Sequence, residues 1–211
     1  LNRDVFDNLG FTIGEASIVR MADGHFYAVF GNGYNSGSGK AVLYIVGLDD
    51  ADGDGDIEVI ALDTGTTANG MSSPLVVDED GDRIADTIYA GDLKGNLWKV
   101  DVTSTNSGRW GFSFTRDRLP APLFTATDGT NPQPITAKPQ ARLHPTEDGV
   151  LVLFGTGKYF ETDDSVIDDS PQIQTFYGVF DRGAAVSRGE LVRQRILSEG
   201  TLEAFSVRVT S

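Results

Sequence analysis

The feature that most constrains the fold is an apolar strand followed by a glycine turn, which occurs three times along the chain. The three copies are residues 26–34 (FYAVFGNGY), 87–100 (TIYAGDLKGNLWKV) and 150–160 (VLVLFGTGKYF). A second apolar strand that ends in aspartate accompanies each copy, at residues 41–49, 96–101 and 175–181. Short apolar runs closed by Gly, Asn and Asp are typical of strands joined by turns. The chain is therefore predicted to be all-β and built from hairpin units.

The spacing of these units indicates a repeat architecture. Their leading glycines, Gly31, Gly91 and Gly155, lie about 60 residues apart, which exceeds the roughly 40–50 residues of common propeller blades and implies inserted loops. We expect one β-propeller domain over residues 1–211, with blade-like units at roughly 11–65, 66–118 and 119–183 and no assignment for 184–211. Three or four units are fewer than the 4–8 blades of a closed propeller, so we expect a partial propeller or a fragment.

Charge and composition exclude several classes of partner. The chain has 31 acidic and 17 basic side chains, and its formal net charge of −14 opposes binding to nucleic acid. It has no cysteine and two histidines, His25 and His144, which lack suitably spaced partners in sequence and are expected to be structural or surface residues. Any metal ion must therefore be held by oxygen. No segment reaches the roughly 20 apolar residues of a membrane span, and residues 1–10 carry no signal peptide, so the sequence is expected to start inside a larger protein or after processing.

One acidic loop has the spacing of a calcium site. It offers the carboxylates of Asp78, Asp80, Asp82 and Asp86 at loop positions 1, 3, 5 and 9, and the carbonyl of Ile84 at position 7. Ca2+ takes six to eight oxygens and tolerates irregular geometry, whereas Mg2+ demands a near-ideal octahedron. The loop lacks the position-12 glutamate of an EF-hand and is flanked by predicted strands, so we predict an EF-hand-like Ca2+ loop on a β framework. The alternative is a turn in which Asp and Gly serve only local hydrogen bonds.

A second acidic loop is a weaker candidate for Ca2+. It offers the side chains of Asp50, Asp52 and Asp54, the carbonyl of Asp56, and Glu58 at position 9. A solvated, glycine-rich surface loop explains the same residues, because ordering a flexible loop opposes metal binding. Both interpretations of this loop stay open at the level of sequence.

Three motifs in a fixed order resemble a known family. Residues 69–74 (NGMSSP), 76–82 (VVDEDGD) and 89–99 (YAGDLKGNLWK) are similar to the C-terminal β-propeller domain of PilY1/PilC-type type IV pilus proteins, and residues 30–34, 43–45, 153–160 and 174–177 extend the similarity. The resemblance implies a modified propeller with quinoprotein-like blade repeats and a calcium loop at Asp78, Asp80, Asp82, Ile84 and Asp86. It also implies a pilus biogenesis protein and tip adhesin that acts in pilus extension and retraction, twitching motility and surface attachment. The implied partners are minor pilins and host-cell or surface ligands, and the implied location is the bacterial surface and pilus tip, after export through the periplasm to the outer membrane.

Two other functions compete with this interpretation. Quinoprotein dehydrogenases use related propellers with Ca2+, and residues 91–98 look like their repeat, but shared repeats indicate fold rather than catalysis. The chain lacks their vicinal cysteine pair and has no serine nucleophile elbow, so we predict that it is not an enzyme. A carbohydrate- or host-receptor-binding module is the other alternative, with Tyr34, Trp110 and the acidic rim loops expected to be exposed for ligand contact. Trp98, in contrast, is expected to pack between blades.

Overall fold

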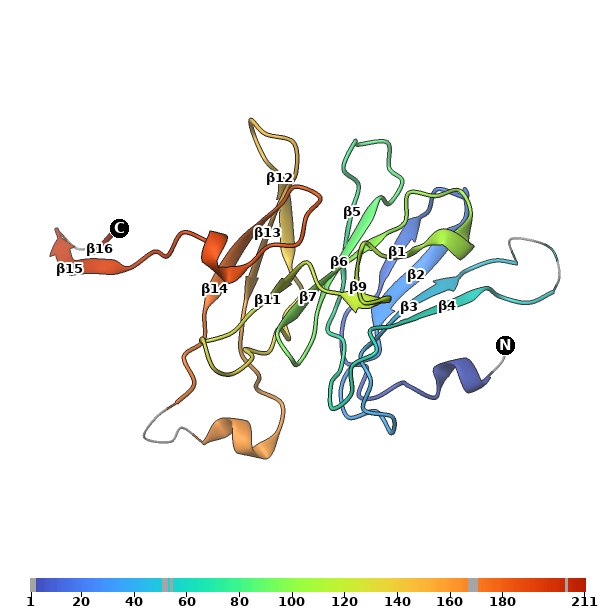
Figure 1. Ribbon diagram of the computed structural model, residues 1–211, viewed down its shortest axis with the longest axis horizontal. Helices are drawn as coiled ribbons and strands as arrows, with labels where there is room; N and C mark the ends of the chain where they lie inside the picture. Colours follow the sequence, from blue (N-terminus) through green and yellow to red (C-terminus); the bar gives the residue numbers. More distant parts are fainter. Residues whose placement is uncertain (1–2, 51–52, 54, 167–170, 204) are drawn as a thin grey trace.

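The computed structural model describes residues 3–50, 53, 55–166, 171–203 and 205–211, and three sheets stand side by side in it (Figure 1). The first sheet has the order β1 (Ser17–Arg20), β2 (Phe26–Gly31), β3 (Val42–Gly47) and β4 (Val59–Asp63). The second has the order β11 (Phe124–Thr125), β7 (Asn96–Asp101), β6 (Thr87–Gly91) and β5 (Leu75–Val77), with β8 (Gly111–Phe112) also paired to β7. The third has the order β12 (Gln140–Leu143), β13 (Val150–Gly155) and β14 (Phe176–Asp181).

Smaller elements complete the described part of the chain. Two further antiparallel pairs are β9 (Phe114–Arg116) with β10 (Leu119–Ala121), and β15 (Ile196–Leu202) with β16 (Phe205–Thr210). The 3-10 helices are η1 (Arg3–Phe6), η2 (Ser107–Arg109), η3 (Thr162–Ser165) and η4 (Arg188–Glu190). No helix in these residues has the length and apolar character needed to cross a membrane.

The strand pairs expected from the glycine pattern are present in all three sheets. β2 pairs with β3, β6 with β7, and β13 with β14, each antiparallel. The all-β prediction is confirmed. The connections differ in length, however: four residues, 92–95, separate β6 from β7, whereas residues 32–41 separate β2 from β3 and residues 156–175 separate β13 from β14. A tight hairpin turn is therefore present in only the second unit. The second unit was expected to end near residue 118, but β11 lies beyond that position and pairs with β7 of the second sheet.

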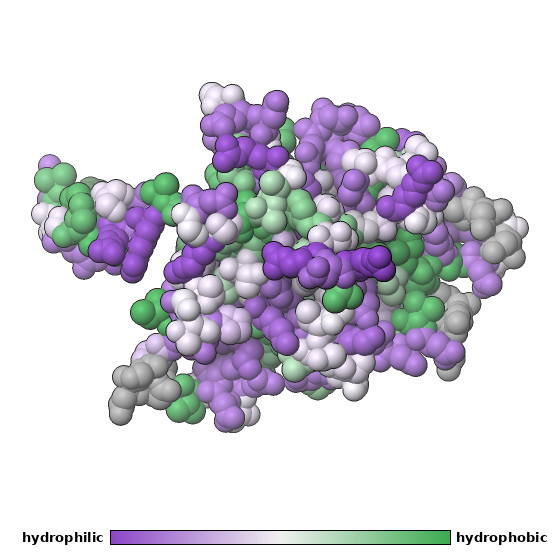
Figure 2. All heavy atoms as spheres, in the orientation of Figure 1, coloured by the Kyte–Doolittle hydropathy of each residue, from purple (hydrophilic) through white to green (hydrophobic). Residues whose placement is uncertain are grey.

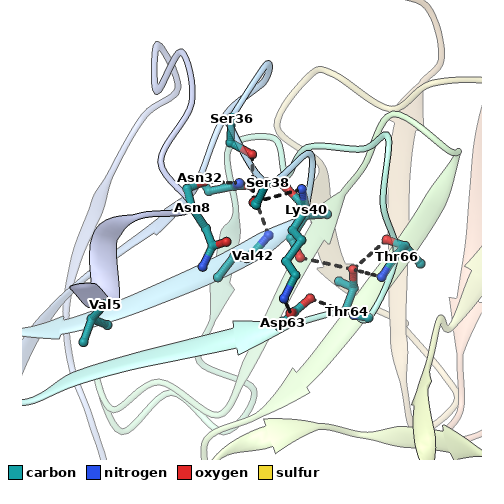
Figure 3. Close-up of polar contacts among 12 residues, drawn as sticks. Val5, Asn8, Asn32, Ser36, Ser38, Lys40, Val42, Asp63, Thr64 and Thr66 are labelled. Atoms are coloured by element: carbon teal, nitrogen blue, oxygen red, sulfur yellow. Dashed lines mark hydrogen bonds and ion pairs between the residues drawn. The ribbon is translucent and has the colours of Figure 1, made fainter. Parts of the chain in front are cut away.

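A buried polar residue follows the leading glycine of the first unit and organises its turn. Asn32 is fully buried, and its Oδ1 accepts the N–H groups of Val42 and Met71 at 3.0 Å each. Its Nδ2 donates to the carbonyls of Asn8 at 2.7 Å and Lys40 at 2.8 Å (Figure 3). The side-chain amide of Asn32 thus connects three segments: the one before the first sheet, the connection between β2 and β3, and the segment that leads into the second sheet.

Asp92 plays the corresponding role in the second unit. This fully buried carboxylate accepts the backbone N–H groups of Lys94 and Asn96 on Oδ1, each at 2.9 Å. On Oδ2 it accepts the Nδ2 groups of Asn69 and Asn96 and the Nε1 group of Trp98, also at 2.9 Å each. The prediction that Trp98 packs between blades is confirmed, since the residue is 2% exposed and belongs to the cluster between the first and second sheets. Five donors compensate the cost of burying this charge.

Two hydrophobic clusters fill the spaces between neighbouring sheets. One cluster joins the first and second sheets and includes Tyr27, Leu43 and Trp98. The other joins the second and third sheets and includes Tyr89 and Phe154. Polar contacts reinforce the second junction: buried Asp181 accepts a hydrogen bond from the Tyr89 hydroxyl at 2.7 Å and forms an ion pair with the Lys99 ammonium at 2.7 Å. Burial, followed by the hydrogen bond to Asp181, raises the pKa of Tyr89 far above its usual range.

The expectation that Trp110 is exposed is wrong. Its side chain is 5% exposed and lies edge-on to Tyr27, with ring centroids 5.1 Å apart. Its Nε1 donates to the carbonyl of Ser104 at 2.7 Å. A polar surrounding sequence suggested exposure, but a long-range aromatic contact buries the ring.

The expectation that Tyr34 is exposed is also wrong, because it joins the first unit to the third. The side chain is 5% exposed and stacks on Phe160 with ring centroids 4.4 Å apart, while its hydroxyl donates to the carbonyl of Thr136 at 3.4 Å. Desolvation, with a smaller effect of Asp92, raises the pKa of Tyr34 to about 12. The three units are therefore connected pairwise.

The segment left unassigned by sequence ends in an exposed hairpin. β15 and β16 project away from the three sheets (Figure 1), and their residues are exposed along both strands. Figure 2 shows hydrophobic side chains on this hairpin beside hydrophilic ones. Among them, Phe205 is 70% and Val209 is 55% exposed.

Candidate metal-binding loop

The first acidic loop connects β5 to β6, as the sequence predicted, and lies at the same end of the sheets as the β12–β13 connection (Figure 1). Its backbone turns sharply, with a φ of 85° at Gly81 and 70° at Arg83. The glycine suits this left-handed conformation, because a Cβ atom is disfavoured there. The sharp turn brings the two ends of the loop together.

Carboxylates shape the loop by accepting its backbone N–H groups. Asp78 accepts from Gly81 at 2.7 Å on Oδ1 and from Arg83 at 2.8 Å on Oδ2. Asp80 accepts from the N–H of Asp82 at 3.0 Å. These are the Asx-type bonds expected for a turn, and they preorganise the loop without using all the lone pairs of each carboxylate.

Three of the predicted ligands converge. Asp78, Asp80 and Asp86 each present one carboxylate oxygen, and these three oxygens lie within 4.8 Å of one another. Because Ca2+ binds oxygen at 2.3–2.6 Å, two ligands of one ion can be up to about 5 Å apart. The cluster therefore fits a single Ca2+ ion. Asp82 is outside this group, and its Oδ1 accepts the N–H of Ile84 at 2.7 Å.

The pKa values of two candidate ligands, Asp86 and Asp78, are shifted by their surroundings. Desolvation, together with the charges of Asp80, Glu79 and Asp78, raises the pKa of Asp86 above its ordinary value, although a hydrogen bond from the Glu79 N–H opposes the shift. At Asp78, desolvation acts upward but backbone donors, led by Arg83, lower the pKa overall. A cation beside Asp86 would oppose the upward shift of its pKa.

Glu79 supports the loop in a way that the spacing pattern did not reveal. Its N–H donates to Asp86 Oδ2 at 2.7 Å, and its Oε1 accepts from the hydroxyl of Thr87 at 2.7 Å. Beside the loop is a cavity of about 430 Å³, whose charged lining residues are Glu79, Asp80, Asp86, Lys99 and Asp101. The contacts of Glu79 depend on the return of the chain into β6, which loop spacing alone does not specify.

The second acidic loop is only partly described. Asp52 and Asp54 lie outside the described residues. Asp50 accepts the N–H groups of Gly53 at 2.8 Å and Gly55 at 2.9 Å. Glu58 accepts from the hydroxyls of Tyr27 at 2.8 Å and Ser107 at 2.6 Å. Glu58 therefore has a structural role at the base of the first sheet, which competes with metal ligation.

The two histidines occupy polar or aromatic surroundings. His25 Nδ1 lies 3.4 Å from Asp49 Oδ2, and the ring of His144 stacks on Phe180 with centroids 4.5 Å apart. These contacts fit the structural or surface roles expected for both residues.

Comparisons with known proteins agree on one family. A family model described as the PilY1 beta-propeller domain matches residues 2–205. A type IV pilus biogenesis factor PilY1 homolog from Xylella fastidiosa is 38% identical over 207 residues, which is 90% of this chain and 13% of the relative. PilY1 from Pseudomonas aeruginosa strain UCBPP-PA14 is 38% identical over 192 residues, 83% of this chain and 16% of the relative. The chain thus spans well under a fifth of these relatives.

A solved structure supports the same conclusion about the fold. The crystal structure of the Pseudomonas aeruginosa PilY1 C-terminal domain superposes with a TM-score of 0.81 at 31% identity, covering all of this chain and 48% of the solved one. The β-propeller prediction is confirmed, and the sheets do not close into a ring in the described residues.

Proposed function

The chain belongs to the PilY1 β-propeller domain family, and from this premise we propose that it is the calcium-binding propeller region of a type IV pilus biogenesis protein. The proposed roles are control of pilus extension and retraction, and surface attachment. Proposed partners are minor pilins and surface or host-cell ligands, at the pilus tip on the bacterial surface. The names of the relatives, which are pilus biogenesis factors, support a non-enzymatic role in pilus assembly.

The convergence of Asp78, Asp80 and Asp86 is the observation that carries the calcium proposal. Three carboxylates this close repel one another, and a bound Ca2+ ion supplies the positive charge that offsets this repulsion. Asp78 follows the end of β5, whereas Asp86 precedes the start of β6, so ligation by both fixes the two strand ends relative to each other. A ligand that binds the folded loop selectively stabilises it by linkage.

Calorimetric titration of Ca2+ into chelator-stripped protein tests this proposal. Asp78→Ala and Asp86→Ala are expected to abolish the binding heat, since each removes a converging oxygen. Asp148→Ala is the matched control, because Asp148 is exposed on the neighbouring β12–β13 connection, and it should bind like the parent protein. Asp52→Ala tests the second loop, and a second saturable site lost in this variant would assign Ca2+ there as well. Absence of both heat and thermal shift in the parent protein would refute the calcium proposal.

The pilus role needs a separate test in cells. The Asp78→Ala and Asp148→Ala substitutions would be placed in the full-length gene, and twitching and surface pili would be measured. Loss of twitching only with Asp78→Ala, at equal protein abundance, supports a calcium-dependent role. Equal twitching in both variants would separate pilus function from this loop.

The alternative of a carbohydrate- or receptor-binding module receives less support. Two of its expected contact residues, Tyr34 and Trp110, are buried, which leaves the acidic loops as its contact surface. Glycan binding that disappears with chelator would restore this alternative, whereas calcium binding without glycan binding favours a role within the pilus machinery.

A further inference from the structure

The peptide group between Ile84 and Ala85 connects the acidic loop of the second unit to the first unit. Its carbonyl belongs to Ile84, the predicted ligand at loop position 7, and its N–H belongs to Ala85. That N–H donates to the carbonyl of Arg20, the last residue of β1, at 2.9 Å. Because β1 is an edge strand of the first sheet, the candidate metal loop is hydrogen-bonded directly to the neighbouring unit.

The planarity of this peptide group determines where its two polar ends point. The peptide bonds of the described residues are all trans, so the carbonyl of Ile84 and the N–H of Ala85 point in opposite directions. Since the N–H is directed at the first unit, the carbonyl is directed away from that unit. One rigid group can therefore meet a cation on one side and the first unit on the other.

The residues that follow Ile84 are anchored on several sides. The side chain of Ala85 is 4% exposed and belongs to the cluster between the first and second sheets, together with Met21. The N–H of Asp86 donates to the carbonyl of Val77 in β5 at 3.0 Å, and its carbonyl accepts the N–H of Val102, just after β7, at 3.0 Å. This segment is thus part of the packed junction as well as part of the loop.

On the first unit, the segment contacts the turn that joins β1 to β2. Met21 directly follows Arg20 and is fully buried. Its N–H donates to the carbonyl of His25 at 2.9 Å, and its carbonyl accepts the N–H of Gly24 at 2.9 Å. The turn is therefore closed by its own hydrogen bonds next to the carbonyl that Ala85 contacts. Holding the loop segment in place also restrains this turn.

We propose that Ca2+ binding in the acidic loop tightens the junction between the first and second units through the Ile84–Ala85 peptide group and thereby rigidifies the β1–β2 turn. This inference rests on the calcium-binding function proposed above. A cation at the Ile84 carbonyl polarises the peptide group, which makes the Ala85 N–H a stronger donor to Arg20. Ligation also restricts the loop, so that this N–H stays directed at its acceptor.

Amide hydrogen exchange of the parent protein, with Ca2+ and with chelator, tests the coupling. Ala85 and the amides of residues 21–25 should exchange about tenfold more slowly with Ca2+. The amides of β13 in the third sheet are the internal control, and their exchange should change by less than about twofold. Asp78→Ala should remove the difference between the two conditions, because it removes a converging ligand.

The effect of a first-unit substitution on Ca2+ affinity provides a second measurement, because coupling between two sites is reciprocal. Met21→Ala leaves every candidate ligand in place but loosens the cluster that holds Ala85. Its Ca2+ affinity, measured by calorimetry, should be about tenfold weaker than that of the parent protein. Val152→Ala is the matched control, since Val152 is equally buried but belongs to the second cluster, and its affinity should stay within about twofold of the parent.

Failure of the coupling can be distinguished from failure of calcium binding. Slower exchange confined to residues 78–86, or equal affinities in Met21→Ala and Val152→Ala, would overturn the coupling while calcium binding itself stands. Equal slowing in all three sheets would indicate general stabilisation and would overturn the coupling too. Absence of binding heat in the parent protein would refute the calcium proposal, and the coupling with it.

Discussion

Removal of the Asp92 carboxylate should be among the most destabilising single changes in this chain. Five donor groups converge on it, three of them from side chains. The backbone N–H of exposed Lys94 and the groups of half-buried Asn96 can be rehydrated after the change. Asn69 Nδ2 keeps its bond to Thr66 Oγ1, but its second N–H and the Nε1 of Trp98 lose their acceptor. Both lie in residues only 3% and 2% exposed, so water cannot replace the carboxylate.

The magnitude for Asp92→Ala follows from these two buried donors. Each buried donor left without a partner costs about 1–3 kcal/mol, so the expected loss is about 4 kcal/mol. This is a large share of the roughly 5–15 kcal/mol that stabilises typical domains. Asp92→Asn should be nearly as harmful, because an amide N–H₂ group would face the donors now bound to Oδ2, although the shape of the side chain is kept.

Urea unfolding followed by tryptophan fluorescence measures this effect. With a slope of about 2 kcal/mol per molar urea, a loss of about 4 kcal/mol lowers the midpoint by about 2 M. The exposed residue Asp148 supplies the control, and Asp148→Asn should leave the free energy of unfolding unchanged within about 0.5 kcal/mol. A loss of less than about 1 kcal/mol in the free energy of unfolding of Asp92→Asn would refute the reasoning, since the shape of the side chain would then be enough to keep the fold stable.

Three further changes have definite expected outcomes. Asp86→Asn should raise the thermal midpoint in the presence of chelator, because the raised pKa of Asp86 means that the folded loop disfavours its ionised form at neutral pH. In the same variant, the rise in thermal midpoint that Ca2+ causes in the parent protein should disappear. The Ca2+ affinity measured by calorimetry should be constant near neutral pH and weaken as the pH falls through the raised pKa of Asp86. This weakening should begin at a pH above the usual aspartate pKa near 3.9, and a pH-independent affinity would contradict the prediction. Trp110→Ala should lower the free energy of unfolding by about 3–5 kcal/mol in urea titration, as expected for a buried ring, and a neutral effect would indicate an exposed one.

The sequence predicted features that depend on local spacing. The strand pairs followed from apolar runs that end in glycine, and the convergence of Asp78, Asp80 and Asp86 agrees with their loop positions. Asp82 is outside that cluster because its carboxylate caps the N–H of Ile84, a local bond that competes with ligation. Loop spacing gives the candidates for ligation but does not decide between these uses.

Features that depend on contacts between residues far apart in the sequence could not be predicted from local spacing. Tyr34 is buried by Phe160, which is 126 positions away (160 − 34), and Trp110 is buried by Tyr27. Polar neighbours in sequence misled the prediction for Trp110, since burial is set by tertiary contacts. Asp92 carried a usable signal, because it directly follows a leading glycine, as Asn32 does in the first unit.

The contact between Tyr34 and Phe160 has a consequence for how the chain loses its structure. Linear repeat proteins can fray from one end, because each repeat contacts only its neighbours. Here the first unit touches the second, the second touches the third, and the Tyr34–Phe160 stack returns from the third to the first. Each of the three units therefore contacts both of the others, so unfolding of any one unit removes two of the three contacts at once. The three sheets should therefore unfold cooperatively in one transition, rather than peel away in order.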